Sequence, residues 1–104
     1  MSKSPTELSL DLLRKDGYLA QVVEKWVPGA NIRKDLFGFI DILAIGEDRT
    51  IAVQCTSYSN ISDRVKKISE SDTVSAVRKA NWVIEVHGWR KVGNRWTVKR
   101  IDLS

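Results

Sequence analysis

Two short apolar segments separated by a four-residue turn constrain the fold of this chain more than any other feature. Residues 39–45 (FIDILAI) and 50–56 (TIAVQCT) are rich in apolar and β-branched residues, and residues 46–49 (GEDR) between them suit a tight turn. This pattern is typical of a β-hairpin. Because both faces of each strand are largely apolar, we expect a sheet that other elements cover on both sides.

Two polar residues, Asp41 and Gln54, interrupt the strands of this hairpin. If Ile45 pairs with Thr50, the register places Asp41 opposite Gln54, and strand alternation puts Thr56 on the same face. The opposite face is expected to carry Ile40, Ile42, Ala44, Ile51, Val53 and Cys55. A buried carboxylate and a buried amide each cost free energy unless a partner satisfies them. Either the two side chains form a structural pair, or a ligand such as a metal ion binds them.

The N-terminal segment has the signals of a helix. Ser4 suits the N-cap, Pro5 the first helical position and Glu7 the third helical position, where it completes a capping box. Basic residues followed by Gly17 suit a C-terminus, so we predict that the helix ends near Lys15.

Residues 18–27 (YLAQVVEKWV) are ambiguous. Their apolar residues fit one stripe of a helix, which leaves a single long helix through Gly17 as an alternative. Their β-branched and aromatic content, closed by Pro28 and Gly29, favours a strand, which we predict. Residues 31–37 are expected to form a basic loop or an edge segment.

The second half of the chain alternates helix and strand signals. Ser59 or Asn60 is expected to cap a helix, and its apolar stripe is Ile61, Val65 and Ile68. Later elements are expected at residues 71–79 (a short helix), 82–89 (a strand), 91–95 (a turn) and 96–103 (a strand). Three tryptophans, Trp82, Trp89 and Trp96, are expected to pack the terminal hairpin onto the sheet. The pattern predicts one α/β domain over residues 1–104.

Composition limits the possible partners. The chain carries 17 Lys and Arg residues against 13 Asp and Glu, a formal net charge of +4. The basic residues cluster at residues 64–67, 78–79, 90–91 and 99–100. This surplus favours a polyanion such as a nucleic acid, with a merely solvated surface as the alternative. One cysteine excludes an internal disulfide. Without an apolar run of ~20 residues or a signal-peptide pattern, we expect a soluble intracellular protein without a membrane partner.

The order of elements and the place of Asp41 resemble the PD-(D/E)XK nuclease superfamily, most closely its small phage-encoded Holliday-junction-resolvase-like and Mrr-like nucleases. The resemblance covers about residues 7–89, and its most specific part is residues 38–57. Ile40 and Asp41 stand where the family has its PD motif. Residues 53–56 (VQCT) stand at the (D/E)XK strand, in the variant form that has Gln54. The resemblance implies a restriction-endonuclease-like core (α-β-β-β-α-β), in which helices flank a mixed central sheet, with a C-terminal hairpin added.

The resemblance also implies an activity. Its members are metal-dependent DNA endonucleases that hydrolyse phosphodiester bonds with Mg²⁺ or Mn²⁺, and resolvase relatives are structure-specific homodimers. A bacterial cell or a phage-infected host would place such a protein in the cytoplasm. The metal ligands implied here are Asp41, Gln54, the backbone carbonyl of Cys55 and, from the first helix, Glu7. Glu24 would serve in place of Glu7 if residues 18–27 were helical.

One departure from the family pattern affects catalysis. Thr56 occupies the position of the family's lysine and carries no charge. Lys67 or Lys34 is the candidate replacement, and the expected phosphate-binding residues are Arg33, Lys34, Arg64 and Lys67. A nucleic-acid-binding module that has lost catalysis on the same fold is the alternative, with a small protein-binding regulator as a third.

Overall fold

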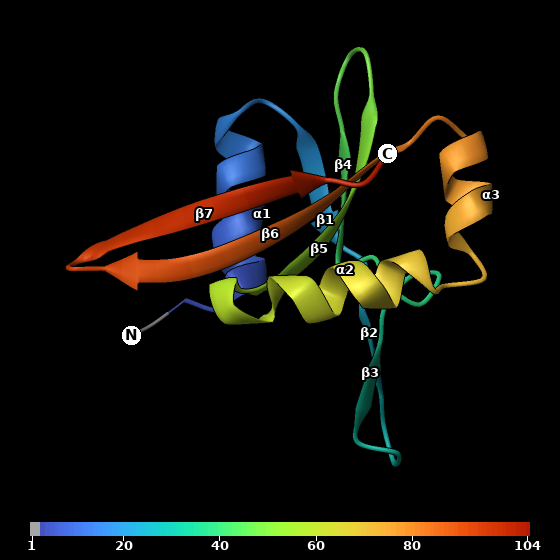
Figure 1. Cartoon of the computed structure of the whole chain (residues 1–104), viewed down its shortest axis with the longest axis horizontal. Coiled ribbons are helices and arrows are strands. Elements are labelled where there is room, and N and C mark those ends of the chain that lie inside the picture. Colours follow the sequence, from blue (N-terminus) through green and yellow to red (C-terminus); the bar gives the residue numbers. More distant parts are fainter. Residues whose placement is uncertain (1–2) are drawn as a thin grey trace.

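The computed structural model describes residues 3–104 and has an α/β architecture in which helices cover a mixed five-stranded sheet (Figure 1). The helices are α1 (Pro5–Lys15), α2 (Ile61–Ser69) and α3 (Val74–Lys79), with a short 3-10 helix, η1 (Tyr58–Asn60). The strands are β1 (Leu19–Val22), β2 (Lys25–Val27), β3 (Ile32–Lys34), β4 (Ile42–Ile45), β5 (Thr50–Ser57), β6 (Val83–Val92) and β7 (Arg95–Asp102).

The sheet has the strand order β1-β4-β5-β6-β7, and β2 and β3 form a separate two-stranded sheet. Strands β5 and β6 are parallel, whereas the other neighbours are antiparallel. Leu13 of α1 packs with one face of the sheet, and Ile68 of α2 and Val77 of α3 pack with the other. The expected cover on both faces is therefore confirmed. No helix within residues 3–104 is long and apolar enough to cross a membrane.

Helix α1 begins and ends where its sequence signals predict. The Ser4 hydroxyl accepts a hydrogen bond from the Glu7 backbone N–H at 3.2 Å, which satisfies one of the free donors of the first turn. The helix ends at Lys15, and Gly17 takes the left-handed conformation (φ +94°) that reverses the chain into β1.

The hairpin register is confirmed, because Ile45 pairs with Thr50 and the ladder continues to Ile42 and Val53. The expected start of the first strand is wrong, since β4 begins at Ile42. Phe37 (φ 53°) and Gly38 (φ 86°) lie in the left-handed region and make residues 36–40 a turn. As a result, Ile40 packs in the core under α2 and α3, not on the α1 side with Ile42 as predicted.

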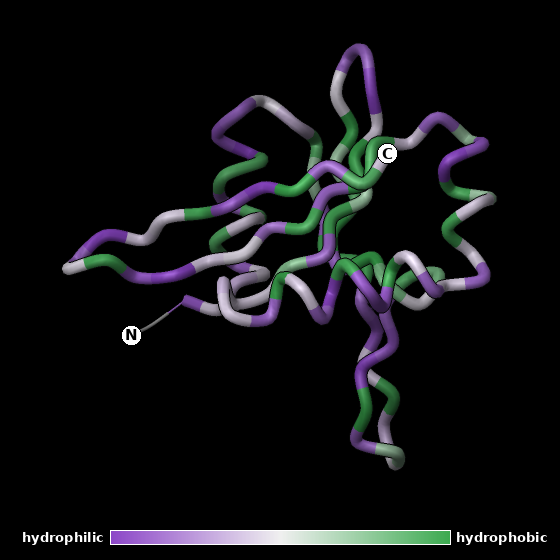
Figure 2. The backbone as a smooth tube through the Cα atoms, in the orientation of Figure 1, coloured by the Kyte–Doolittle hydropathy of each residue, from purple (hydrophilic) through white to green (hydrophobic). Residues whose placement is uncertain are grey.

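Residues 18–27 form strands, as predicted, and the alternative of one long helix is wrong. The segment is divided, however, because β1 belongs to the main sheet and β2 leaves it. Strand β2 pairs with β3, and residues 25–34 form a hairpin that projects from the sheet, which we call the arm (Figure 1). Residues 31–37, expected to be a loop or edge segment, supply β3. Figure 2 shows that the base of the arm is hydrophilic.

The second half of the chain follows the predicted order with different bounds. The apolar stripe of α2 points to the core, but neither α2 nor α3 has a side-chain hydrogen bond at its N-cap, and α3 begins at Val74. Strands β6 and β7 are longer than expected and join through the two residues Gly93 and Asn94. Their ends, residues 90–99, project beyond the helices, and we call them the ribbon. Trp96 is 39% exposed, so its predicted packing onto the sheet is wrong, whereas Trp89 is buried.

Gly88 allows η1 and the start of α2 to lie directly on β6. A Cβ at this position would lie 2.2 Å from Cδ1 of Ile61 and 3.3 Å from Cα of Tyr58. We therefore expect Gly88→Ala to lower the free energy of unfolding by about 1–3 kcal/mol, since the core is overpacked there. Urea unfolding measures this change, and Gly93→Ala is no control because Gly93 has a positive φ. A loss below about 0.5 kcal/mol would show that Ile61 moves aside easily.

Candidate metal centre

Three carboxylates meet where the arm joins the sheet. One ligand oxygen from each of Glu24, Asp35 and Asp41 lies within 4.8 Å of the others. Lys25 pairs with Lys34 at the base of the arm, so Glu24 and Asp35 are the residues by which the chain enters and leaves it. Asp41 directly precedes β4. The topology thus brings together acids that are far apart in the sequence.

Asp41 is held firmly and is almost fully buried, with 4% of its surface exposed. Its Oδ2 accepts hydrogen bonds from the backbone N–H of Cys55 at 2.8 Å and from Nε2 of Gln54 at 2.6 Å. Its own backbone is tied to both neighbouring strands, donating to Val53 and accepting from Val23. The predicted juxtaposition of Asp41 and Gln54 is therefore confirmed.

This environment disfavours the charged form of Asp41. Burial raises the pKa of its carboxyl, and the neighbouring carboxylates of Asp35 and Glu24 add to the rise. The hydrogen bond from Cys55 acts in the opposite direction, and the pKa of Asp41 comes to about 7. A cation between the three acids would offset the repulsion among them, which is one of the causes of the raised pKa of Asp41.

Gln54 supplies a second polar group that lacks a counterpart. Its side chain is 2% exposed, and its Oε1 is a buried atom without a hydrogen-bond partner. Such an unsatisfied buried oxygen costs about 1–3 kcal/mol. A half-turn of the amide would place Oε1 beside the Asp41 carboxylate, an arrangement that requires a shared cation or proton. A metal ion or a buried water molecule could satisfy this oxygen.

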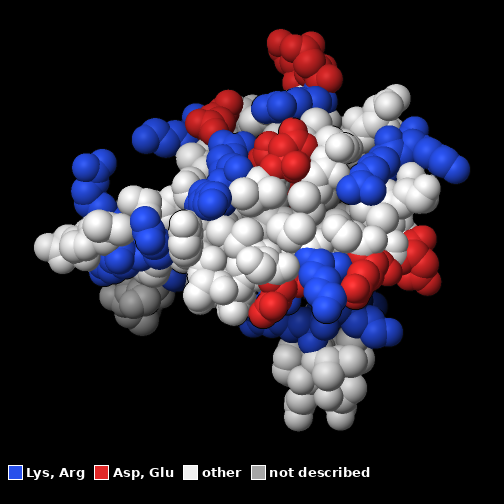
Figure 3. Space-filling view, in the orientation of Figure 1, with Lys and Arg blue, Asp and Glu red and all other residues white. Residues whose placement is uncertain are grey.

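Basic side chains lie beside two of the acids, and Figure 3 shows Lys and Arg next to Asp and Glu where the arm meets the rest of the molecule. Nζ of Lys67 lies 3.2 Å from Oδ2 of Asp35, and Nη1 of Arg33 lies 3.4 Å from Oε1 of Glu24. Nε of Arg64 lies 3.4 Å from the hydroxyl of Thr56. Of the two candidate replacements for the family lysine, the structure brings Lys67 to the carboxylates. Three of the four predicted phosphate-binding residues also lie around this centre.

A cleft of about 580 Å³ opens beside the centre, between the first turn of α1, the base of the arm and the start of α2. Its lining residues are Ser4, Pro5, Thr6, Glu7, Val22, Glu24, Arg33, Cys55, Thr56, Ser57, Asn60 and Arg64. The cleft gives a solvent-accessible approach to Glu24 and to the basic side chains of Arg33 and Arg64.

Other predicted site residues lie elsewhere. Lys34 is exposed and pairs across the arm with Lys25, on the face opposite Arg33. Glu7 is exposed on the wall of the cleft and is not in the acidic cluster. The Cys55 thiol points into the core under α1, where burial raises its pKa to about 12, and only its backbone faces Asp41.

For two of the three acids, the sequence did not predict the role that the structure gives them. Asp35 was missed, and Glu24 was expected to contribute only from a helix, whereas it lies in the break between β1 and β2. The turn residues Pro28 and Gly29 were the available signal. Read as the tip of a hairpin, they place Glu24 and Asp35 together at its base.

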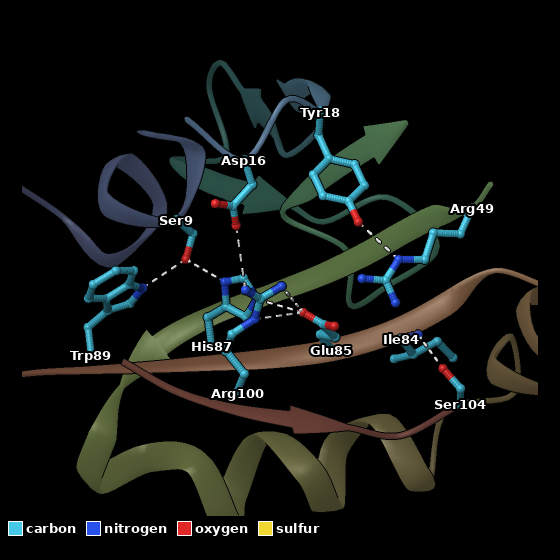
Figure 4. Close-up of polar contacts among 10 residues, drawn as sticks. All are labelled: Ser9, Asp16, Tyr18, Arg49, Ile84, Glu85, His87, Trp89, Arg100 and Ser104. Atoms are coloured by element: carbon cyan, nitrogen blue, oxygen red, sulfur yellow. Dashed lines mark hydrogen bonds and ion pairs between the residues drawn. The ribbon is translucent and has the colours of Figure 1, made fainter. Parts of the chain in front are cut away.

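A second polar cluster, between α1 and the C-terminal strands, has a structural role (Figure 4). The Ser9 hydroxyl accepts a hydrogen bond from Nε1 of Trp89 at 2.8 Å and lies 3.0 Å from Nδ1 of His87. Nε2 of His87 lies 2.9 Å from Glu85, which also accepts from Arg100. Ser9 and His87 are both 0% exposed, so no substrate reaches this serine. His87 is thus a satisfied core histidine.

The charge of Glu85 is stable in this cluster. Burial raises the pKa of Glu85, but the hydrogen bonds with His87 and Arg100 have a larger opposite effect, so that this pKa falls to about 2.

Comparisons with protein families, with curated proteins and with solved structures give no match to this chain. The functional conclusion therefore depends on the centre formed by Glu24, Asp35, Asp41 and Gln54.

Proposed function

We propose that this protein is a metal-dependent DNA endonuclease on a restriction-endonuclease-like core, and that it hydrolyses phosphodiester bonds in branched DNA. The observation that carries this proposal is the convergence of the carboxylates of Glu24 and Asp35 on that of Asp41, next to Gln54, whose buried Oε1 has no partner among the described residues. Action in the cytoplasm as a homodimer, whose two sites would cut two strands symmetrically, is part of the same proposal.

The donor set fits Mg²⁺ or Mn²⁺, which prefer oxygen ligands. Asp41 and Gln54 would hold the ion from the sheet, and Glu24 and Asp35 would hold it from the base of the arm. The Cys55 carbonyl is available as well, because the N–H and C=O of a strand residue point to the same side and this N–H faces Asp41. When bound, such an ion polarises a phosphoryl oxygen and acidifies a water molecule.

The basic side chains of the chain would orient the phosphate. Arg33 and Arg64 line the cleft and can each donate two hydrogen bonds to phosphate oxygens. Thr56, at the family's lysine position, holds the Arg64 guanidinium through its hydroxyl. Lys67, anchored on Asp35, would place a positive charge where the transition state gains negative charge.

The arm favours DNA with unpaired or distorted bases. Trp26 is 52% exposed and pairs with Arg33, so the two side chains share the face that borders the cleft. An exposed tryptophan beside a cation can stack on an unpaired base. Lys25 and Lys34, directly opposite each other on the other face, repel unless a polyanion lies between them.

The decisive experiment is cleavage of labelled four-way-junction and duplex DNA. We expect cutting with Mg²⁺ or Mn²⁺, none with EDTA, and a preference for the junction. Lys67→Met should lower the single-turnover rate about 100-fold, because a charge that stabilises the transition state is lost. Lys66→Met, an exposed neighbour on the same helix, is the matched control and should cut at the wild-type rate. No metal-dependent cutting by the wild type would refute the proposal.

One observation favours the alternative of a non-catalytic nucleic-acid-binding module. The Arg64 guanidinium donates a hydrogen bond to the hydroxyl of Thr56, the residue at the position of the family's lysine. A group suited to binding phosphate therefore lies where the family has its catalytic lysine. A binding module would bind DNA with a steep salt dependence but would show neither cleavage nor stabilisation by Mg²⁺ or Mn²⁺. The same assays thus separate the two functions.

A further inference from the structure

The ribbon projects outside the metal centre, and all of its charged residues are basic. Its ten residues, RKVGNRWTVK, contain four cations and no acid. The residues from Arg90 to Thr97 are all exposed, and the two strands extend away from the helices (Figure 1). A charged ribbon of this kind has no packing role in the fold, because its tip contacts neither core.

Three of the four cations lie on one face of the ribbon. The register pairs Val92 with Arg95 and Gly88 with Lys99, and alternation along β6 puts Arg90 on the same face as Gly88 and Val92. Arg90, Arg95 and Lys99 therefore point to the side of η1 and α2. Within residues 3–104 none of the three forms an ion pair.

This basic face continues to the cleft. The Arg90 guanidinium lies 4.3 Å and the Lys99 ammonium 5.9 Å from the ring centroid of Tyr58. Tyr58 directly follows Ser57, a lining residue of the cleft. The first turn of α1 and the start of α2, which also line the cleft, lie in the angle between ribbon and arm (Figure 1).

We propose that the ribbon binds the phosphate backbone of the DNA duplex that leads into the cleft. The inference rests on the proposed function for the direction of the duplex, whereas the binding itself depends only on the ribbon. Three cations without an ion pair in the described part of the chain lie on one face, two of them near the Tyr58 ring, and such a face matches a row of phosphates. The molecule measures 39 × 39 × 25 Å, so a duplex lying along ribbon and cleft would be contacted over about one helical turn.

The test compares two triple variants with the same net charge. Arg90→Gln/Arg95→Gln/Lys99→Gln removes the basic face of the ribbon. Lys15→Gln/Lys66→Gln/Lys79→Gln removes three exposed cations from the ends of α1 and α3 and from α2. Fluorescence anisotropy with a 20-bp duplex, in EDTA to prevent cutting, gives the dissociation constant between 50 and 300 mM salt.

We expect the ribbon variant to bind at least 10-fold more weakly than the control variant at 100 mM salt. Its slope of log K against log [salt] should be smaller by about 2.7, since each lost phosphate contact removes about 0.9. Equal affinities and slopes for the two variants would overturn the proposal. The proposal would also be overturned if the ribbon variant lost binding to vesicles of anionic lipid but bound the duplex as tightly as the control variant.

The failure of this inference is distinguishable from failure of the nuclease proposal. Cleavage by the wild type tests the nuclease proposal, and duplex affinity in EDTA tests the ribbon proposal, so each proposal has its own readout. If the wild type does not cut at all but the ribbon variant still loses affinity, only the nuclease proposal fails. If cutting occurs and duplex affinity is unchanged in the ribbon variant, only the ribbon proposal fails.

Discussion

Replacing Asp41 with asparagine is expected to raise the free energy of unfolding of the metal-free protein at pH 8 and to abolish its stabilisation by Mg²⁺ or Mn²⁺. Metal-dependent cleavage should disappear as well. The first effect has an electrostatic cause, because at pH 8 the wild type holds a buried, charged Asp41 beside two other acids. Asparagine keeps an acceptor for the Cys55 N–H without the charge.

The pH dependence follows from the direction of the pKa change. The pKa of Asp41 is raised from 3.8 to about 7, so folding favours the protonated form. The stability that Asp41 contributes is then fully present below about pH 4 and is lost as the pH rises through 7, by roughly 4 kcal/mol in all. The metal-free wild type should therefore be more stable at pH 5 than at pH 8. Glu85, with its pKa lowered to about 2, stays charged in the folded protein throughout that window.

Urea unfolding at pH 5 and pH 8, with and without Mg²⁺, measures these effects. We expect Asp41→Asn to gain roughly 2–4 kcal/mol at pH 8 and to lose most of the pH dependence. Asp72→Asn, which replaces an exposed aspartate after α2, is the matched control and should change neither quantity. A destabilised Asp41→Asn, together with a wild type that Mg²⁺ does not stabilise, would show that Asp41 is a structural residue.

The parts of this centre that sequence reasoning identified are those with a local signature. Asp41 and Gln54 interrupt two apolar strands whose register is fixed by a four-residue turn, so their pairing follows from strand periodicity. Lys67 lies on an amphipathic helix that begins just after β5, and its neighbourhood follows from that connection. Each inference needed only one element or one tight turn.

Asp35 and Glu24 lacked such a signature. Strands β2 and β3 have three residues each and carry mostly exposed side chains, so no apolar alternation marks them as strands. Their pairing brings Glu24 and Asp35 together across eleven positions of the sequence, which propensity alone does not indicate. The displaced start of β4 has a similar cause. Phe37 takes a left-handed conformation that a bulky residue rarely adopts, and its carbonyl accepts a hydrogen bond from the distant Thr73 hydroxyl at 2.6 Å.

The Ser9 hydroxyl ties helix α1 to the C-terminal strands, and removal of this hydroxyl should cause a large loss of stability. The Trp89 indole donates to the Ser9 oxygen, Nδ1 of His87 lies 3.0 Å from that oxygen, and Nε2 of His87 lies 2.9 Å from Oε1 of Glu85 (Figure 4). Every member is buried and satisfied. The network joins residues 78 and 80 positions apart in the sequence.

Ser9→Ala leaves the indole N–H and the imidazole Nδ1 without partners in a site that excludes water. Each unsatisfied buried group costs about 1–3 kcal/mol, so we expect a loss of roughly 2–4 kcal/mol in the free energy of unfolding. Urea unfolding of Ser9→Ala beside Ser62→Ala, an exposed serine of α2, measures the difference, and the control should change by less than about 0.5 kcal/mol. A loss for Ser9→Ala no larger than the control's would mean that water replaces the hydroxyl. In that case the apolar contacts of Leu10 and Leu13 would be the main attachment of α1 to the sheet.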